Sequence, residues 1–237
     1  MTLSYSVKNE VERLLAKLDM PNCYRSYQWK TDTWETGFPD LFTLEQEISL
    51  AARNNSLDRN HLLKIAEWGD LPNKKAIFCQ NPIKITLYVN GSPAMWLKNE
   101  PENAVLILDG KIRGFGPTYC SKVLHFAVPQ VFGALDTRLV RTFGEGDPAS
   151  KRYHLLNLVA SGERWAISSS QPGWPGEYGT WCAILNYIAD TLNQNGTACP
   201  LPSKYLESGL RKDTSWLPAD VETALFSYAS KVVETKD

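Results

Sequence analysis

The sequence predicts an all-α fold. Most apolar residues recur at intervals of three and four, which is the period of a helix that buries one face. Hydrophobic residues make up 43% of the 237 positions, enough for a sizeable core and too many for a disordered chain. The chain contains no internal repeats and no low-complexity segment. We therefore expect one compact domain, or two closely packed lobes, built from helices.

The first helices follow from the apolar pattern and from capping signals. Residues 6–18 place five valines and leucines on one stripe. The helix expected at 43–53 starts at Thr43, which has capping-box spacing with Gln46. Another helix is expected at 57–68, where a turn with glycine and proline follows it.

The second part of the chain continues this pattern. Residues 83–90 fit a strand as well as a helix, because the apolar run is short. Two segments rich in turn residues, 168–179 and 195–204, predict loops. The remaining helices are expected at 101–109, 117–128, 137–143, 153–160, 176–194 and 218–232.

The cysteines argue against a disulfide framework and against a zinc site. They are five in number, scattered, and without a Cys-X-X-Cys pair. The first residues do not have the pattern of a signal peptide, and no apolar run is long enough to cross a bilayer. We expect a cytoplasmic, monomeric protein without a membrane partner, a metal or a cofactor.

Positive charge gathers in one region of a nearly neutral chain. The net charge is −1, which excludes a generally basic nucleic-acid-binding protein but leaves room for a local basic stripe. Residues 111–152 contain seven basic and three acidic residues, a balance of +4. The rest of the chain therefore has a balance of −5.

The most informative stretch, "IRGFGPTYCSKVLHF", occupies residues 112–126. Two glycines permit a tight turn, and Pro117 suits the first position of the following helix. A turn of this kind points free backbone amides outward at the positive end of a helix, where they can bind a phosphate. An ordinary turn between two helices fits the same pattern, because Gly-X-Gly is common.

Residues 135–141, "LDTRLVR", favour the first interpretation. Together with the glycine stretch they resemble the helix-hairpin-helix DNA glycosylases, and most of all an 8-oxoguanine-glycosylase-like branch. The similarity is specific over residues 104–143, and "PADVETALFSY" at 218–228 resembles the last helix of that branch more weakly. The resemblance implies a two-lobed helical fold with a central cleft. One lobe would comprise 43–135, and the other 1–42 together with 136–237.

The resemblance also implies a catalytic carboxylate. The family places an aspartate eighteen residues after a nucleophilic lysine; here Asp136 fits, but Thr118 replaces the lysine. Lys122, one helical turn further, is a candidate for a relocated nucleophile, a group that hydrogen-bonds the base, or a partner of Asp136 or of a phosphate. Asp136 also suits the N-cap of the helix at 137, and in this family one residue performs both roles.

The expected DNA contacts come from the hairpin and from aromatic residues. A phosphate would be held by the hairpin backbone and nearby cations, namely Lys111, Arg113, Gly114, Gly116, Thr118 and Arg138. Four aromatic side chains, each of which also fits a core position, are candidate walls of a pocket for an extruded base: Trp174, Tyr178, Trp181 and Phe226. Asn73 is a candidate to fill the space that the base leaves.

These expectations amount to a DNA glycosylase that extrudes and excises a damaged or modified base from double-stranded DNA, such as the oxidised purine 8-oxoguanine. AP lyase activity would be added if Lys122 acts as a nucleophile. A non-catalytic helix-hairpin-helix protein that binds DNA is the alternative that the threonine at 118 favours. A helical protein that shares the hairpin by chance is the third.

Overall fold

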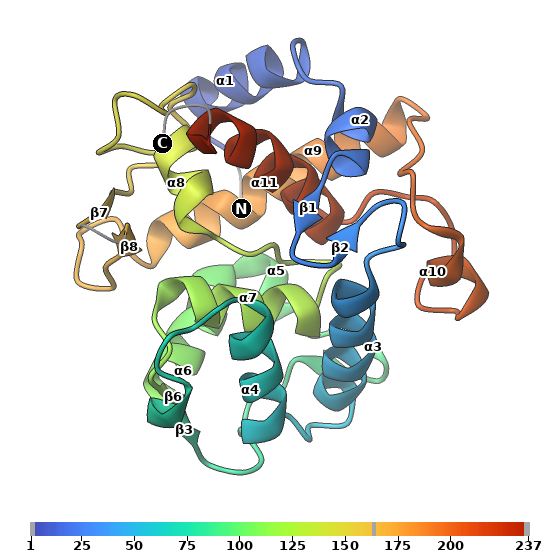
Figure 1. The fold of residues 1–237 in the computed structure, drawn as a ribbon, viewed down its shortest axis with the longest axis vertical. Coiled ribbons are helices and arrows are strands. Elements are labelled where there is room, and N and C mark those ends of the chain that lie inside the picture. Colours follow the sequence, from blue (N-terminus) through green and yellow to red (C-terminus); the bar gives the residue numbers. More distant parts are fainter. Residues whose placement is uncertain (1–2, 163–164, 235–237) are drawn as a thin grey trace.

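The computed structural model describes residues 3–162 and 165–234 and consists mainly of helices (Figure 1), which confirms the predicted helical class. The helices are α1 (Tyr5–Leu15), α2 (Met20–Arg25), α3 (Pro39–Arg53), α4 (Arg59–Trp68), α5 (Trp96–Asn99), α6 (Pro101–Lys111), α7 (Pro117–Ala127), α8 (Thr137–Phe143), α9 (Gly176–Gln194), α10 (Ser203–Glu207), α11 (Pro218–Glu234) and the 3₁₀ turn η1 (Lys74–Ala76).

The strands in the described part of the chain are two residues long and pair in antiparallel ladders. The pairs are β1 (Gln28–Trp29) with β2 (Asp32–Thr33), β3 (Phe78–Cys79) with β6 (Ile112–Arg113), β4 (Tyr88–Val89) with β5 (Ser92–Pro93), and β7 (Ala160–Ser161) with β8 (Ala166–Ile167). No helix within the described ranges combines the length and the apolar character needed to cross a bilayer.

The helices pack in two groups. In the lower half of Figure 1, α3, α4 and α6 pack on α7, and α5 packs on α6. In the upper half, α2, α8 and α9 pack on α11, and α1 packs on α9. A contact between α6 and α9 joins the groups, and the buried apolar side chains form one continuous core. The division into two lobes therefore stays a prediction.

Local signals fixed several helix ends correctly. Helix α7 starts at Pro117 and α8 at Thr137, as expected. Helix α9 covers the whole predicted range 176–194. At α8 the Asp136 carboxylate accepts a hydrogen bond from the Arg138 amide at 2.9 Å, so the predicted N-cap is present.

Helix α3 begins four residues before the predicted start at Thr43, at Pro39. The cap comes from Asp32, whose Oδ1 accepts hydrogen bonds from the amides of Asp40 at 2.8 Å and Leu41 at 3.2 Å. The Thr43 hydroxyl donates to the Pro39 carbonyl within the helix instead of capping it. The expected capping box at 43–46 was therefore wrong, because a side chain outside the local sequence supplies the cap.

The helix predicted at 153–160 is absent; the chain there is irregular and ends in β7. The amides of Leu155 and Leu156 donate to the Phe143 carbonyl at 2.8 and 3.1 Å, and the Arg152 amide donates to the Thr142 carbonyl at 2.9 Å. The segment thus satisfies carbonyls at the end of α8. The ambiguous 83–90 segment is not helical either, and its end forms β4.

Candidate active site

The glycine hairpin joins β6 to α7, and its two glycines meet different surroundings. Gly114 has φ +85°, and a Cβ there would lie 2.7 Å from the Ala76 carbonyl oxygen, so the fold itself requires glycine. Gly116 has extended backbone with φ −113° and ψ −169°, and a Cβ there would meet no atom within 4 Å. The fold therefore gives no reason for glycine at 116.

The hairpin has exposed backbone amides and nearby cations that can bind an anion. Gly114 and Gly116 are exposed, and Thr118 is half-buried. The amides of Gly116 and Thr118 lie at the start of α7, where helix geometry provides no intrahelical acceptor. Lys111 and Arg113 are exposed beside them in the sequence. These are the residues predicted to hold a phosphate, and that role stays a prediction.

A small pocket lies where α7, α8 and α11 meet. Its cavity volume is about 20 Å³, which is room for about one water molecule. Of the predicted site residues, the structure brings Asp136, Lys122 and Phe226 together here. The full lining is Tyr27, Trp29, Leu41, Trp68, Lys122, His125, Ala134, Asp136, Glu222, Thr223 and Phe226.

The two carboxylate oxygens of Asp136 have different roles: one caps a helix, and the other lies near Lys122 in the pocket. Its Oδ1 caps α8, while its Oδ2 lies 3.7 Å from Nζ of Lys122. The Asp136 side chain is 13% exposed, so it is mostly buried but reached by the pocket. The single carboxylate thus caps the helix and faces the pocket, as the resemblance implied.

Lys122 is surrounded by aromatic rings. Its Nζ lies 5.1 Å from the ring centre of Trp68, 5.2 Å from that of Tyr119 and 6.0 Å from that of Trp29. Rings at these distances attract a cation through their negative faces, and Asp136 adds a negative charge. The pocket therefore offers attractive contacts to a cation at this position.

Of the two remaining predicted DNA contacts, Arg138 lies beside the pocket, whereas Asn73 is not one of the residues that line it. The guanidinium carbon of Arg138 lies 5.3 Å from the ring centre of Trp29 and 5.6 Å from that of Phe226, so Arg138 covers two pocket walls. Asn73 is exposed and directly precedes η1. Asn73 is not among the residues that line the pocket.

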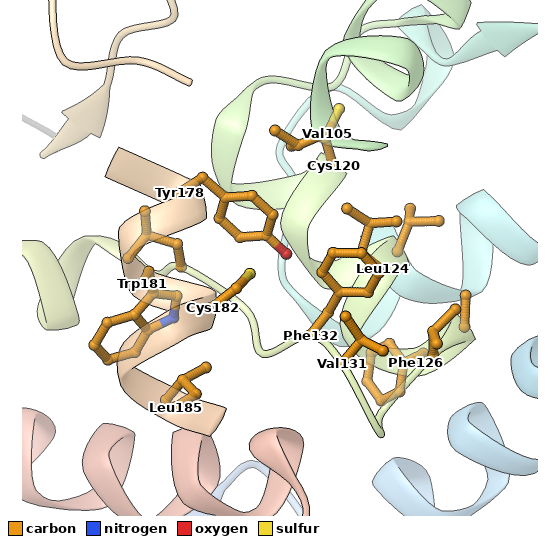
Figure 2. Close-up of a cluster of buried hydrophobic side chains, with 14 of the residues drawn as sticks. Val105, Cys120, Leu124, Phe126, Val131, Phe132, Tyr178, Trp181, Cys182 and Leu185 are labelled. Carbon is orange, nitrogen blue, oxygen red and sulfur yellow. The ribbon is translucent and has the colours of Figure 1, made fainter. Parts of the chain in front are cut away.

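The structure corrects three of the four predicted pocket walls. Tyr178 and Trp181 are fully buried in the cluster that Figure 2 shows, and Trp174 is also buried. The Tyr178 hydroxyl donates to the Gly133 carbonyl at 3.2 Å, and the Trp181 indole N–H donates to the Ala134 carbonyl at 2.9 Å. These rings brace the chain that leads to Asp136 and do not line the pocket.

Sequence reasoning missed an imidazole and a second carboxylate in the pocket, those of His125 and Glu222. His125 lies three positions after Lys122 on α7, and this spacing places both on one face of a helix. That signal was available from the sequence. Glu222 comes from α11, more than eighty residues beyond Asp136, so only the tertiary structure brings it to the pocket.

Two tyrosines at or beside the pocket, Tyr27 and Tyr119, have raised pKa values. Burial raises the pKa of the Tyr27 hydroxyl well above its ordinary value, and the carboxylates of Glu222, Asp32 and Asp136 act in the same direction. Burial likewise raises the pKa of Tyr119, with a further contribution from Asp136. Both phenols therefore remain neutral hydrogen-bonding groups near neutral pH.

Among residues 3–162 and 165–234, no cluster of three or more histidine, cysteine, aspartate or glutamate side chains could hold a metal ion. No family model, no curated protein and no solved structure matches this chain significantly.

Proposed function

We propose that the protein is a DNA glycosylase that removes a damaged or modified base, such as the oxidised purine 8-oxoguanine, from double-stranded DNA. The observation that carries this proposal is Asp136, which caps α8 with one oxygen and turns the other into a pocket containing Lys122. A carboxylate held in this way can act on the sugar of a bound nucleotide. The exposed hairpin at 114–116 would hold the adjoining phosphate.

The proposed reaction is hydrolysis of the N-glycosidic bond. The C1′–N bond breaks, and its electron pair leaves with the base. A water oxygen forms the new bond to C1′, and the Asp136 carboxylate takes up the proton that this water releases. Asp136 also stabilises the positive charge that develops on the sugar, which suits an anionic group in a site shielded from solvent.

The pocket must open before a base can enter it. A cavity of about 20 Å³ holds one water molecule and is far smaller than a nucleobase. Arg138 lies over Trp29 and Phe226, which are pocket walls. In the proposal, a phosphate or the extruded base draws Arg138 away, and the two rings then stack on the base.

The test is a panel of duplex oligonucleotides, each with one oxidised, alkylated or deaminated base, incubated with the protein and then treated with hot alkali. The wild-type protein should cause strand breakage at one lesion class. Asp136→Asn should lower the single-turnover rate by roughly 100-fold or more. Its amide oxygen can still cap α8, so folding and DNA affinity should be retained. Absence of breakage across the panel, or full activity of Asp136→Asn, would contradict the proposal.

A bifunctional mechanism is a second candidate, favoured by the 3.7 Å separation of Lys122 Nζ and Asp136 Oδ2. In it, the neutral Lys122 amine bonds to C1′ as the base departs and forms an imine with the opened sugar. Borohydride would trap this imine as a covalent adduct that Lys122→Ala eliminates. A base excised without any adduct assigns Lys122 an electrostatic role, which its aromatic surroundings favour.

A DNA-binding protein without chemistry is the other candidate, and Thr118 in the place of the family lysine favours it. Tight, salt-sensitive duplex binding together with an inactive lesion panel would support this function. Unmeasurable DNA affinity at low salt would instead exclude both DNA functions.

A further inference from the structure

His125 and Glu222 form a buried ionisable pair in the same pocket. The His125 Nδ1 lies 3.1 Å from a carboxylate oxygen of Glu222, and the two side chains are 5% and 8% exposed. Both line the pocket that contains Asp136. A histidine and a carboxylate are seldom buried together without a polar role, because each loses hydration.

The pair is close, but it is not a satisfied hydrogen bond. Although the Glu222 oxygen is near, His125 Nδ1 has no hydrogen-bond partner within the part of the chain that the structure describes. A buried polar atom of this kind carries a free-energy cost that a bound group can relieve. The imidazole is therefore available to a ligand in the pocket.

Packing fixes the orientation of both side chains. The His125 ring meets the Phe126 ring edge-on, with centres 4.8 Å apart and an interplanar angle of 84°. A Cβ at Gly133 would lie 2.7 Å from Cβ of Glu222, so the chain before Asp136 packs directly on the glutamate. The sequence "GALD" at 133–136 thus links the position of Glu222 to that of the catalytic carboxylate.

Several charged or titratable groups face this pair. Glu222 comes from α11, Lys122 from the same helix as His125, and Asp136 from the start of α8. Tyr27 precedes β1 and stays neutral, and Asp32 in β2 also raises the pKa of Tyr27.

We propose that His125 is the general acid that protonates the departing base, and that Glu222 is a positioning residue that holds its imidazole in the pocket. This inference rests on the proposed glycosylase function and deepens it. As the C1′–N bond breaks, its electron pair moves into the base, and His125 transfers one proton to a ring nitrogen or carbonyl oxygen of that base. The hydrolytic water supplies the oxygen to C1′ and a proton to Asp136, and solvent later restores the imidazolium.

In this proposal, different residues of one pocket act on the two products of bond cleavage, the sugar and the base. Asp136 acts on the sugar and the water, while the His125–Glu222 pair acts on the leaving base. It also defines a substrate class: uncharged bases such as 8-oxoguanine, which need a proton to leave. A base that already bears a positive charge, such as N7-methylguanine, needs no such acid.

The experiment measures single-turnover excision from duplexes carrying 8-oxoguanine or N7-methylguanine between about pH 5 and pH 10. His125→Gln should slow excision of 8-oxoguanine by about 100-fold. It should also abolish the alkaline decline in rate that the wild-type protein shows as the imidazolium loses its proton. Glu222→Gln should slow excision of 8-oxoguanine by about tenfold, because the imidazole is no longer held beside the base. Excision of N7-methylguanine, where the wild-type protein performs it, should change by less than about threefold in either variant.

A matched control is His154→Gln, the same change at a half-exposed histidine that pairs with Glu145. It should leave both rates and both pH profiles unchanged. The inference is overturned if His125→Gln keeps the wild-type alkaline decline, or if it remains within threefold of the wild-type rate on 8-oxoguanine. If His125→Gln does not fold, a Glu222→Gln variant that excises 8-oxoguanine at the wild-type rate overturns the inference equally. Wild-type protein that excises neither base, nor any lesion of the wider panel, contradicts the glycosylase function itself.

Discussion

Gly114 and Gly116 are two residues apart, yet a side chain would meet different surroundings at each. At 114, backbone packing and a positive φ require glycine, whereas at 116 a Cβ would project into open space. A glycine at such a position leaves room for the close approach of an external group. In the proposed function that group is a phosphate of the DNA backbone.

Gly116→Ala tests this explanation. We expect the free energy of unfolding to change by less than about 1 kcal/mol, because the extended backbone at 116 accepts alanine. Duplex DNA affinity at low salt should fall by roughly tenfold, because the methyl group blocks the approach of a phosphate to the amides. Fluorescence anisotropy with a labelled duplex and urea unfolding measure the two effects.

Gly110→Ala is the control for this change. Gly110 lies in α6, and a Cβ there also meets no atom within 4 Å. This variant should keep its DNA affinity and gain up to about 1 kcal/mol of stability, because alanine favours the helix. Unchanged affinity of Gly116→Ala would show that the hairpin does not hold the phosphate closely.

At the scale of elements, the start of α3 depends on one buried carboxylate. Asp32 is fully buried and accepts hydrogen bonds from the Asp40 and Leu41 amides and, at 2.9 Å, from the indole N–H of Trp68. Trp68 in turn lines the pocket and faces Lys122. Asp32 thus connects the N-terminus of α3 with one wall of the candidate site.

Asp32→Ala should lower the free energy of unfolding by about 3 kcal/mol, because it leaves buried donors without an acceptor. Asp40→Ala is the matched control: Asp40 is an exposed residue in the first turn of the same helix, where the change should cost less than about 1 kcal/mol. Urea unfolding followed by circular dichroism measures both. Equal, small effects of the two variants would contradict the assignment of Asp32 as the cap of α3.

At the scale of the whole molecule, a buried ion-pair network connects distant parts of the chain. The Arg211 guanidinium bonds both oxygens of Glu45 on α3, 166 positions away in the sequence, and lies 3.3 Å from an oxygen of Asp220 on α11. All three side chains are buried. The network therefore joins the helices of the lower group to those of the upper group.

Arg211→Met should destabilise the protein by about 3–5 kcal/mol, because it leaves two buried carboxylates without a counter-charge. Lys64→Met, which breaks the exposed pair between Lys64 and Glu47, should cost less than about 1 kcal/mol. Urea unfolding of both variants at about pH 7 provides the comparison. Similar small losses in the two would mean that the buried network does not hold the groups together.

The pH dependence of Arg211→Met has a definite sign. Burial raises the pKa of Asp220 even with Arg211 present, and loss of the cation removes the influence that lowers it. A carboxyl with a higher pKa in the folded chain contributes stability below its unfolded pKa and loses it as pH rises through the folded value. The deficit of the variant relative to the wild type should therefore shrink as pH falls from about 7 toward about 5.

Short-range signals in the sequence determined the helical class and several helix ends. Pro117 fixed the start of α7, and Asp136 fixed that of α8, because a proline ring and a capping carboxylate act on the backbone within three residues. Asp136 and Lys122 became site candidates through the family resemblance over residues 104–143, and their roles stay predictions. The three-residue spacing of Lys122 and His125 also indicates, from the sequence alone, that both lie on one face of α7.

Only the tertiary structure decided the rest. Hydrogen bonds between segments set the start of α3, which Asp32 caps. They also give residues 153–160 an irregular conformation, because their amides donate to carbonyls at the end of α8. The pocket likewise draws Tyr27, Asp136 and Glu222 from three distant places, while Tyr178 and Trp181 went to the core. Periodicity reveals which side chains are buried, but whether a buried ring meets a carbonyl or a cavity depends on contacts whose partners lie far away in the sequence.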